Sequence, residues 1–178
     1  TYGYQADDRQ EFDIRRGGRT DRQATDLFLT THTADVTLKH WLGPHVHGKV
    51  GVNGVAQDNY NVPGTGIRPL LPDHTKESIG AYILEHIPVN DRLELEAGVR
   101  LEGTRIKVQR FDADNVLRTP EHRFQNHALS AGLNWTMSDS VRLRANISSA
   151  FRPPHVSELY SEGLHHGSAA IERSEEHT

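Results

Sequence analysis

The sequence predicts an all-β fold, an antiparallel up-and-down transmembrane β-barrel to which this chain contributes about seven strands. Three observations lead to this prediction. Most segments alternate apolar and polar residues, and short and long connections between these segments also alternate. No apolar run reaches the roughly 20 residues that a membrane-spanning helix requires.

The first three predicted strands cover residues 3–14, 28–41 and 45–57. The pattern of 3–14 is weak. In the second strand, Phe28, His32, Ala34, Val36 and Leu38 share one face, and Asp35, Thr37 and Lys39 share the other. In the third strand, Val46, Gly48, Val50, Val52 and Ala56 oppose His47, Lys49, Gly51 and Asn53. Each strand therefore has one mostly apolar and one mostly polar face.

The fourth predicted strand, residues 77–89, is less regular, because Glu85 interrupts its apolar side. The fifth, Leu93 to Leu101, is the clearest, with Leu93, Leu95, Ala97, Val99 and Leu101 on one face and Glu94, Glu96, Gly98, Arg100 and Glu102 on the other. Its length matches the roughly 9 to 11 residues that a tilted strand needs to cross the hydrocarbon core. We expect its apolar face to contact lipid and its charged face to line a watery lumen.

The last two predicted strands are residues 128–137 and 141–149, and both repeat this alternation. Trp41 and Trp135 lie beside short turns, where an aromatic belt would place them. The short turns contain Gly43 and Pro44, Asn90 and Asp91, and Ser138 and Asp139, whereas the polar segments 15–24, 61–75, 111–123 and 161–170 are long.

The strict alternation of short and long connections is typical of an outer-membrane barrel, with short periplasmic turns and long outer loops. A soluble sandwich tends to mix loop lengths at both ends. Bacterial barrels have even strand numbers, and an open edge inside lipid would leave backbone groups unpaired. Seven strands therefore predict part of a larger barrel.

Composition excludes several other classes of protein. The chain has no Cys, which removes disulfides and thiolate metal sites. Its formal net charge is -4 and its basic residues are scattered, so nucleic acid is not an expected partner. The chain has no starting Met and no signal peptide, so any export signal would lie upstream.

The segment SSAFRPPHVSELYSEG, Ser148 to Gly163, resembles a motif late in the barrel of TonB-dependent outer-membrane receptors. The matching residues are Ala150, Phe151, Arg152, Pro154, Glu158, Leu159 and Tyr160. Residues 80–102 resemble a hairpin of the same family, and the likeness extends to residue 172. Pro153 and Pro154 cannot donate to a strand ladder, so they end the strand. Arg152 would then be free to pair with a carboxylate, in a structural role.

This resemblance implies a barrel of about 22 strands in the outer membrane of a Gram-negative bacterium, in contact with outer-membrane lipid. Such receptors are not enzymes. Their outer loops and an N-terminal plug domain bind a scarce nutrient, and the TonB energy-coupling complex pulls on the plug to drive active import. The plug and coupling segment are absent from these residues. Residues 1–172 would belong to the barrel domain, whereas residues 173–178, RSEEHT, resemble a translated sequencing-adapter oligonucleotide and are expected to be non-native.

Twelve His residues suggest a metal ion or metal chelate as the imported ligand. Imidazole and carboxylate groups suit zinc and other borderline metals, and the His-rich segment is similar to loops of the family's zinc-uptake members. Zinc is favoured, followed by iron-siderophore or haem, and no cofactor is required. Solvated loop histidines are the competing interpretation. The candidate metal ligands are His155, Glu158, Glu162, His165 and His166, with Asp73, His74 and His122 on neighbouring loops.

The remaining histidines that we considered, His32, His40, His45, His47 and His86, are expected to be structural. Three other functions stay open. A passive porin or a surface adhesin barrel would lack energy coupling, and a soluble β-sandwich would bury the apolar faces. An outer-membrane hydrolase needs an activated nucleophile beside a base, and the serines near His155 and His166 carry no such signature.

Overall fold

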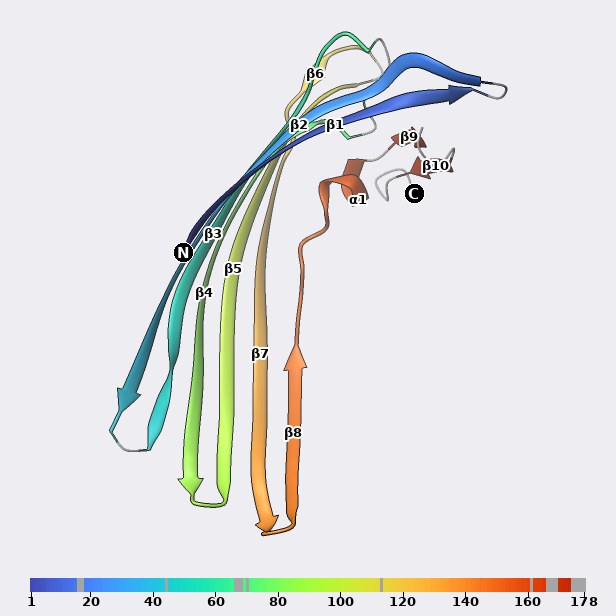
Figure 1. Ribbon diagram of the computed structural model, residues 1–178. Helices are drawn as coiled ribbons and strands as arrows, with labels where there is room; N and C mark the ends of the chain where they lie inside the picture. Colours follow the sequence, from blue (N-terminus) through green and yellow to red (C-terminus); the bar gives the residue numbers. More distant parts are fainter. Residues whose placement is uncertain are drawn as a thin grey trace.

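The computed structural model describes residues 1–15, 18–43, 45–65, 69, 71–112, 114–160, 162–165 and 170–173, and it describes the side chains of these residues except at 13–22 and beyond 160. Seven long antiparallel strands form one sheet (Figure 1). They are β1 (Tyr2–Arg15), β2 (Gly18–Leu42), β3 (Val46–Asn61), β4 (Asp73–Asn90), β5 (Leu93–Phe111), β7 (Glu121–Ser138) and β8 (Val141–Ser149). The predicted all-β, up-and-down architecture is confirmed.

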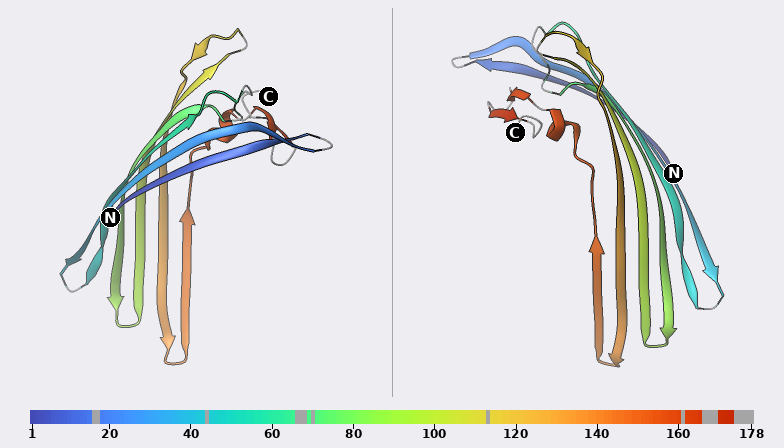
Figure 2. Two further views of the ribbon diagram at one scale, coloured as in Figure 1. Left: turned by 45° about the horizontal axis from the view of Figure 1, so that its top comes forward. Right: turned by 180° about the vertical axis from the view of Figure 1, so that it is seen from behind.

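Each long strand pairs with the next one in sequence, in the order β1-β2-β3-β4-β5-β7-β8. A short strand, β6 (Leu117–Arg118), pairs with the end of β5. The sheet is strongly curved and does not close on itself (Figure 2). Among the described residues, no helix has the length and apolar character of a membrane-spanning segment.

The two ends of the sheet differ. At one end, here called the short-turn end, tight turns join β2 to β3, β4 to β5 and β7 to β8, as predicted. The opposite end, the long-loop end, holds the longer connections at 62–72 and 112–120. It also holds helix α1 (Val156–Tyr160) and the hairpin of β9 (Glu162–His165) and β10 (Ala170–Arg173), none of which the sequence pattern predicted.

The loop predicted over residues 15–24 is wrong. Strand β1 continues to Arg15 and β2 begins at Gly18, so most of this polar segment extends the hairpin instead. The backbone hydrogen bonds between two paired strands do not require apolar side chains. The alternation of apolar residues therefore does not predict how far a hairpin extends into a polar segment. Residues 174–178, where most of the expected non-native tail falls, lie outside the described residues.

The register divides the sheet into two faces. The outer face carries the odd-numbered residues of β5, and the register places Ile83 and Leu129 beside Val99 on that face. Apolar residues cover its lower part, from the short-turn end to Leu101, and many are exposed, including Leu38, Ile79, Leu101 and Ile147. Trp135 pairs with Leu93 on this face, but Trp41 pairs with His47 on the opposite one, so the belt position predicted for Trp41 is wrong.

Glu85 lies on the outer face, and the structure explains how it is tolerated there. Its Oε1 lies 2.8 Å from Nε2 of His40, two strands away. Gly48 lies between them in the register, and a Cβ at Gly48 would lie 2.6 Å from Glu85 Oε2. The absence of a side chain at Gly48 therefore leaves the space through which this His–Glu pair forms.

The opposite, inner face carries the even-numbered residues of β5. A small apolar core lies on it at the long-loop end, formed by buried Ile106, Val108, Val156 and Tyr160, with Leu71, Phe124 and Leu159 packed around them. The core joins α1 to strands β5 and β7. It fixes the start of the C-terminal segment against the sheet, close to the long loops.

Candidate ligand-binding surface on the inner face

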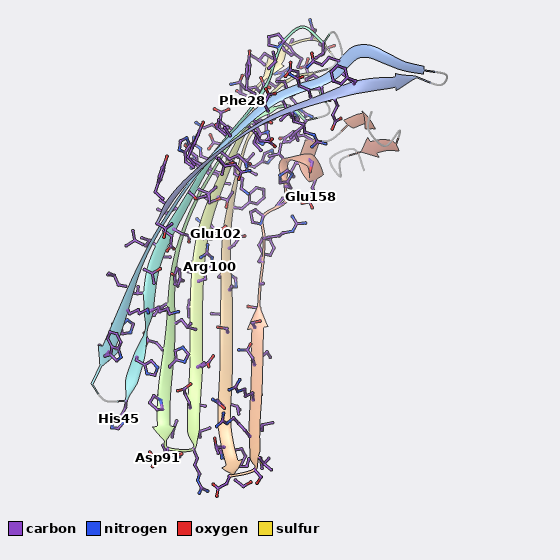
Figure 3. The ribbon with its side chains drawn as sticks, viewed as in Figure 1. Phe28, His45, Asp91, Arg100, Glu102 and Glu158 are labelled. Atoms are coloured by element: carbon purple, nitrogen blue, oxygen red, sulfur yellow. The ribbon has the colours of Figure 1, made fainter. Side chains whose placement is uncertain are left out.

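The inner face is polar over most of its length. Arg100 Nη2 donates to Glu102 Oε2 at 2.5 Å in the middle of β5, where Figure 3 labels both residues. The Tyr82 hydroxyl crosses over Gly51 and lies 2.7 Å from the Thr37 hydroxyl on β2. Charged and hydroxyl groups of this kind are typical of a barrel wall that faces water or polar protein groups, and not of a wall that faces lipid.

The residues that resemble the family motif form a compact unit before and within α1. Arg152 holds Glu158 through two bonds, Nη1 to Oε2 at 2.9 Å and Nη2 to Oε1 at 2.6 Å. The His155 amide also donates to Glu158 Oε2, at 2.7 Å. These bonds lower the pKa of the Glu158 carboxyl to about 2, with the Arg152 side chain as the largest cause. The structural role predicted for Arg152 fits this geometry.

Tyr160, the last residue of α1, connects the motif to the sheet. Its hydroxyl bonds to Nε2 of His122 on β7, and the Arg110 guanidinium lies 4.9 Å from its ring centroid. The Tyr160 side chain is buried against Ile106 and Val108. His122, one of the predicted metal ligands, thus uses one ring nitrogen to bind Tyr160.

His74 and Asp73 begin β4 at the same end of the sheet. His74 is buried, with Nδ1 2.9 Å from the Pro72 carbonyl oxygen. Burial lowers the pKa of His74, and the charge of His155 lowers it further. His155 directly precedes Val156, which packs in the same core as Leu71, three residues before His74. Asp73 Oδ1 accepts from the backbone amide of Asn61 at 2.8 Å and from its side chain at 2.7 Å.

The structure thus brings four of the predicted ligands, Asp73, His74, His122 and His155, to the long-loop end, along with Glu158. Glu158 accepts hydrogen bonds from Arg152, and Asp73 accepts hydrogen bonds from Asn61. Both carboxylates are therefore engaged with protein groups and not positioned to bind a metal. Glu162 and His165 belong to β9, where only the backbone is described, and His166 lies outside the described residues.

A different group of metal-compatible side chains gathers at the short-turn end. His47, His86 and Glu94 each offer one ligand atom, and these atoms lie within 4.8 Å of one another. Among the residues whose side chains are described, this is the one group of three such ligands. His47 was predicted to be structural because it lies at a tight turn on the periplasmic side, and His86 was predicted to be structural as a residue of the membrane interface. Nothing in their sequence spacing indicates that β3, β4 and β5 bring them together with Glu94.

Comparison with known proteins agrees with this architecture. The family model described as TonB dependent receptor-like, beta-barrel matches residues 1–175. No curated protein matches the chain. The match spans every strand of the sheet, together with the Arg152–Glu158 unit and α1. The chain therefore belongs to the TonB-dependent receptor family, as a part of its β-barrel.

Proposed function

We propose that the ligand imported by this outer-membrane receptor is a metal ion or metal chelate, with zinc favoured over iron-siderophore or haem. The family match makes the chain part of the barrel of a transport receptor of the outer membrane, a non-enzymatic protein that works with TonB and a transported ligand. The choice of a metal rests on the histidines at the long-loop end.

The observation that carries this proposal is that His74, at the start of β4, and His155, directly before α1, lie at the same long-loop end of the sheet, where α1 packs against it. Burial lowers the pKa of His74, which favours the neutral imidazole, the form that binds a metal. His155 is exposed and immediately precedes the segment that continues to His165 and His166. Two imidazoles gathered at one end of the sheet are part of a donor set that borderline divalent metals prefer.

We further propose that a plug domain covers the inner face. Several inner-face polar atoms are buried without a hydrogen-bond partner among the described residues, namely Asn53 Oδ1, both amide atoms of Asn126, and Asn134 Oδ1. Buried amides are normally satisfied by protein or ordered water. Ordered water and small side-chain movements beneath a polar plug surface would supply these partners, and additional strands would close the edges of β1 and β8.

The proposal is tested in the full-length receptor, in cells that depend on it for zinc. Replacing His74, His155, His165 and His166 with Ala should reduce uptake of radioactive zinc and growth on limiting zinc. The matched control is His127→Ala, which removes an exposed imidazole from the outer face of β7. Wild-type zinc uptake by the quadruple variant, at equal receptor abundance, would contradict the proposal.

A further inference from the structure

The second metal-compatible group lies at the opposite end of the sheet from the predicted ligands. Within the register, His47, His86 and Glu96 occupy one row across β3, β4 and β5. Glu94 precedes Glu96 by two residues in β5, so it lies closer to the short turn, beside Pro88 of β4. All four residues share the inner face, since cross-strand partners project to the same side of a sheet.

We propose that His47, His86 and Glu94 bind a borderline divalent cation such as Zn²⁺ on the inner face near the short-turn end, with Glu96 as a fourth donor. This proposal does not depend on the identity of the imported ligand, because it states only that these residues bind a metal ion. If the imported ligand is a metal, this site lies on the lumen wall at the end where the metal would leave the barrel.

The distances suit a four-coordinate metal. His86 Nδ1 lies 3.6 Å from Glu94 Oε1 and 3.7 Å from Glu96 Oε1. In a tetrahedral site with bonds of roughly 2.0–2.1 Å, neighbouring ligand atoms lie about 3.3 Å apart. A carboxylate at 3.6 Å is too far for a direct hydrogen bond but close enough to share a cation with the imidazole. Small side-chain rotations would bring these donors to bonding distance.

The two imidazoles are already arranged side by side. The His47 and His86 rings are stacked, with centroids 5.1 Å apart and planes 10° from parallel. The stacked arrangement holds the nitrogen atoms of the two rings near each other, and the pairing of His47 with His86 fixes their backbones. His47 is exposed and His86 half-buried, so water and a metal can reach the pair from the inner side. The donors come from three adjacent strands, which holds them together more firmly than a single loop would.

The charge balance also favours a cation. Glu94 and Glu96 carry two negative charges within reach of His86, and neither makes an ion pair with Arg or Lys among the described residues. The basic residues around these carboxylates are Arg92 and Arg142, which line one pocket with Glu94, Lys49 in the next row, and Arg144, which pairs with Asn134 beside Glu94. A divalent cation bound between the imidazoles and the carboxylates would neutralise the charge of Glu94 and Glu96.

The test is metal binding by the purified full-length receptor. In Co²⁺ titration, the wild type should develop the visible absorption of a low-symmetry four-coordinate site, and Zn²⁺ should displace it. His86→Ala and the double variant His47→Ala/Glu94→Gln should lose that absorption and one equivalent of bound metal. His127→Ala, on the outer face, should retain both.

Wild-type Co²⁺ absorption and stoichiometry in both site variants would overturn the proposed site. Heat-modifiable migration on gels shows whether each variant keeps its barrel, and His86→Asn supplies a second version of similar size if the Ala variant does not fold. The quadruple variant at the long-loop end separates the two proposals. That variant should keep the Co²⁺ absorption whether or not it still imports zinc.

Discussion

Arg152 and Glu158 form a two-bond ion pair that closes the segment ahead of α1, with N–O distances of 2.9 and 2.6 Å. Planar, bidentate pairs of this type fix orientation as well as charge. Because Tyr160 ends the same helix and is buried against the sheet, the pair sets how α1 approaches its core.

The first prediction concerns this pair. Arg152→Ala should increase amide hydrogen exchange in residues 156–160, because Glu158 then loses its largest stabilising contact. Exchange measured by mass spectrometry on the full-length receptor tests this. Arg118→Ala removes an exposed ion pair with Asp112 in another loop and should leave α1 unchanged. Equal exchange in wild type and Arg152→Ala would refute the role given to the pair.

The pH dependence of this unit follows from the lowered pKa of Glu158, about 2 in the folded protein against an ordinary value of 4.5. A carboxyl with a depressed pKa contributes stability above its ordinary pKa and loses that contribution as pH falls through the folded value. Protection of α1 should therefore stay constant from pH 7 to about 5 and decline from pH 4.5 to 2. Glu158→Gln should remove this decline. A decline that persists in the Gln variant would assign it to another group.

The second prediction concerns the core under α1. Ile106 has no exposed surface, so Ile106→Ala should cost about 2–5 kcal/mol in the free energy of unfolding. Urea titration of the receptor in detergent, followed by fluorescence, measures this cost. Leu117→Ala provides the control, since Leu117 is exposed in β6 and should cost far less. Similar losses in both variants would mean that this core contributes nothing beyond surface packing.

The third prediction concerns Gly48. A methyl group there would collide with the Leu84 carbonyl oxygen and with Glu85, so Gly48→Ala should cost about 1–3 kcal/mol. At Gly103, on the same face, a Cβ meets nothing within 4 Å, and Gly103→Ala should be close to neutral. The same urea titration compares the two. A neutral Gly48→Ala would show that the His40–Glu85 pair does not need the gap.

The fourth prediction places lipid on the outer face. Val99→Arg should destabilise insertion by about 2–4 kcal/mol, because it puts a charge among Ile83 and Leu129 in the apolar band. Ser148→Arg adds the same charge to the inner face of β8 and should have little effect. Folding into bilayers of defined thickness measures both. Equal effects would contradict the assignment of the two faces.

The strands and their faces were predictable because alternation is a local property. The alternation within Leu93 to Leu101 alone predicts the two faces of β5, and no information on the neighbouring strands is needed. Helix α1 was not predictable in this way, since its five residues are too few for a helical period and owe their helicity to Arg152 and the core. The length of the β1–β2 hairpin depends on paired backbones, which polar side chains at residues 15–24 do not signal.

The group of His47, His86 and Glu94 shows the same limit. Counting back from the tight turn at Asn90 and Asp91 would pair His86 with Ala97, on the apolar face. A bulge between Pro88 and Asn90 shifts the register by one residue, so His86 pairs with Glu96 instead. A one-residue shift exchanges the two faces of a strand. Pro88 has no amide hydrogen to donate to the ladder, and a proline in a strand is typical of a bulge. Pro88 is therefore the feature of the sequence that indicates this shift in register.

The function of the sheet as a membrane barrel depends most on which face contacts lipid, and spin labels measure this directly. The chain has no Cys, so single Cys substitutions at Val99, Arg100, Leu101 and Glu102 can be labelled in the full-length receptor in bilayers. Labels at 99 and 101 should collide with oxygen dissolved in the bilayer, and labels at 100 and 102 should be shielded from it. Shielding of 99 and 101 from both oxygen and a water-soluble nickel complex would instead place them in a dry protein core, and would contradict the account.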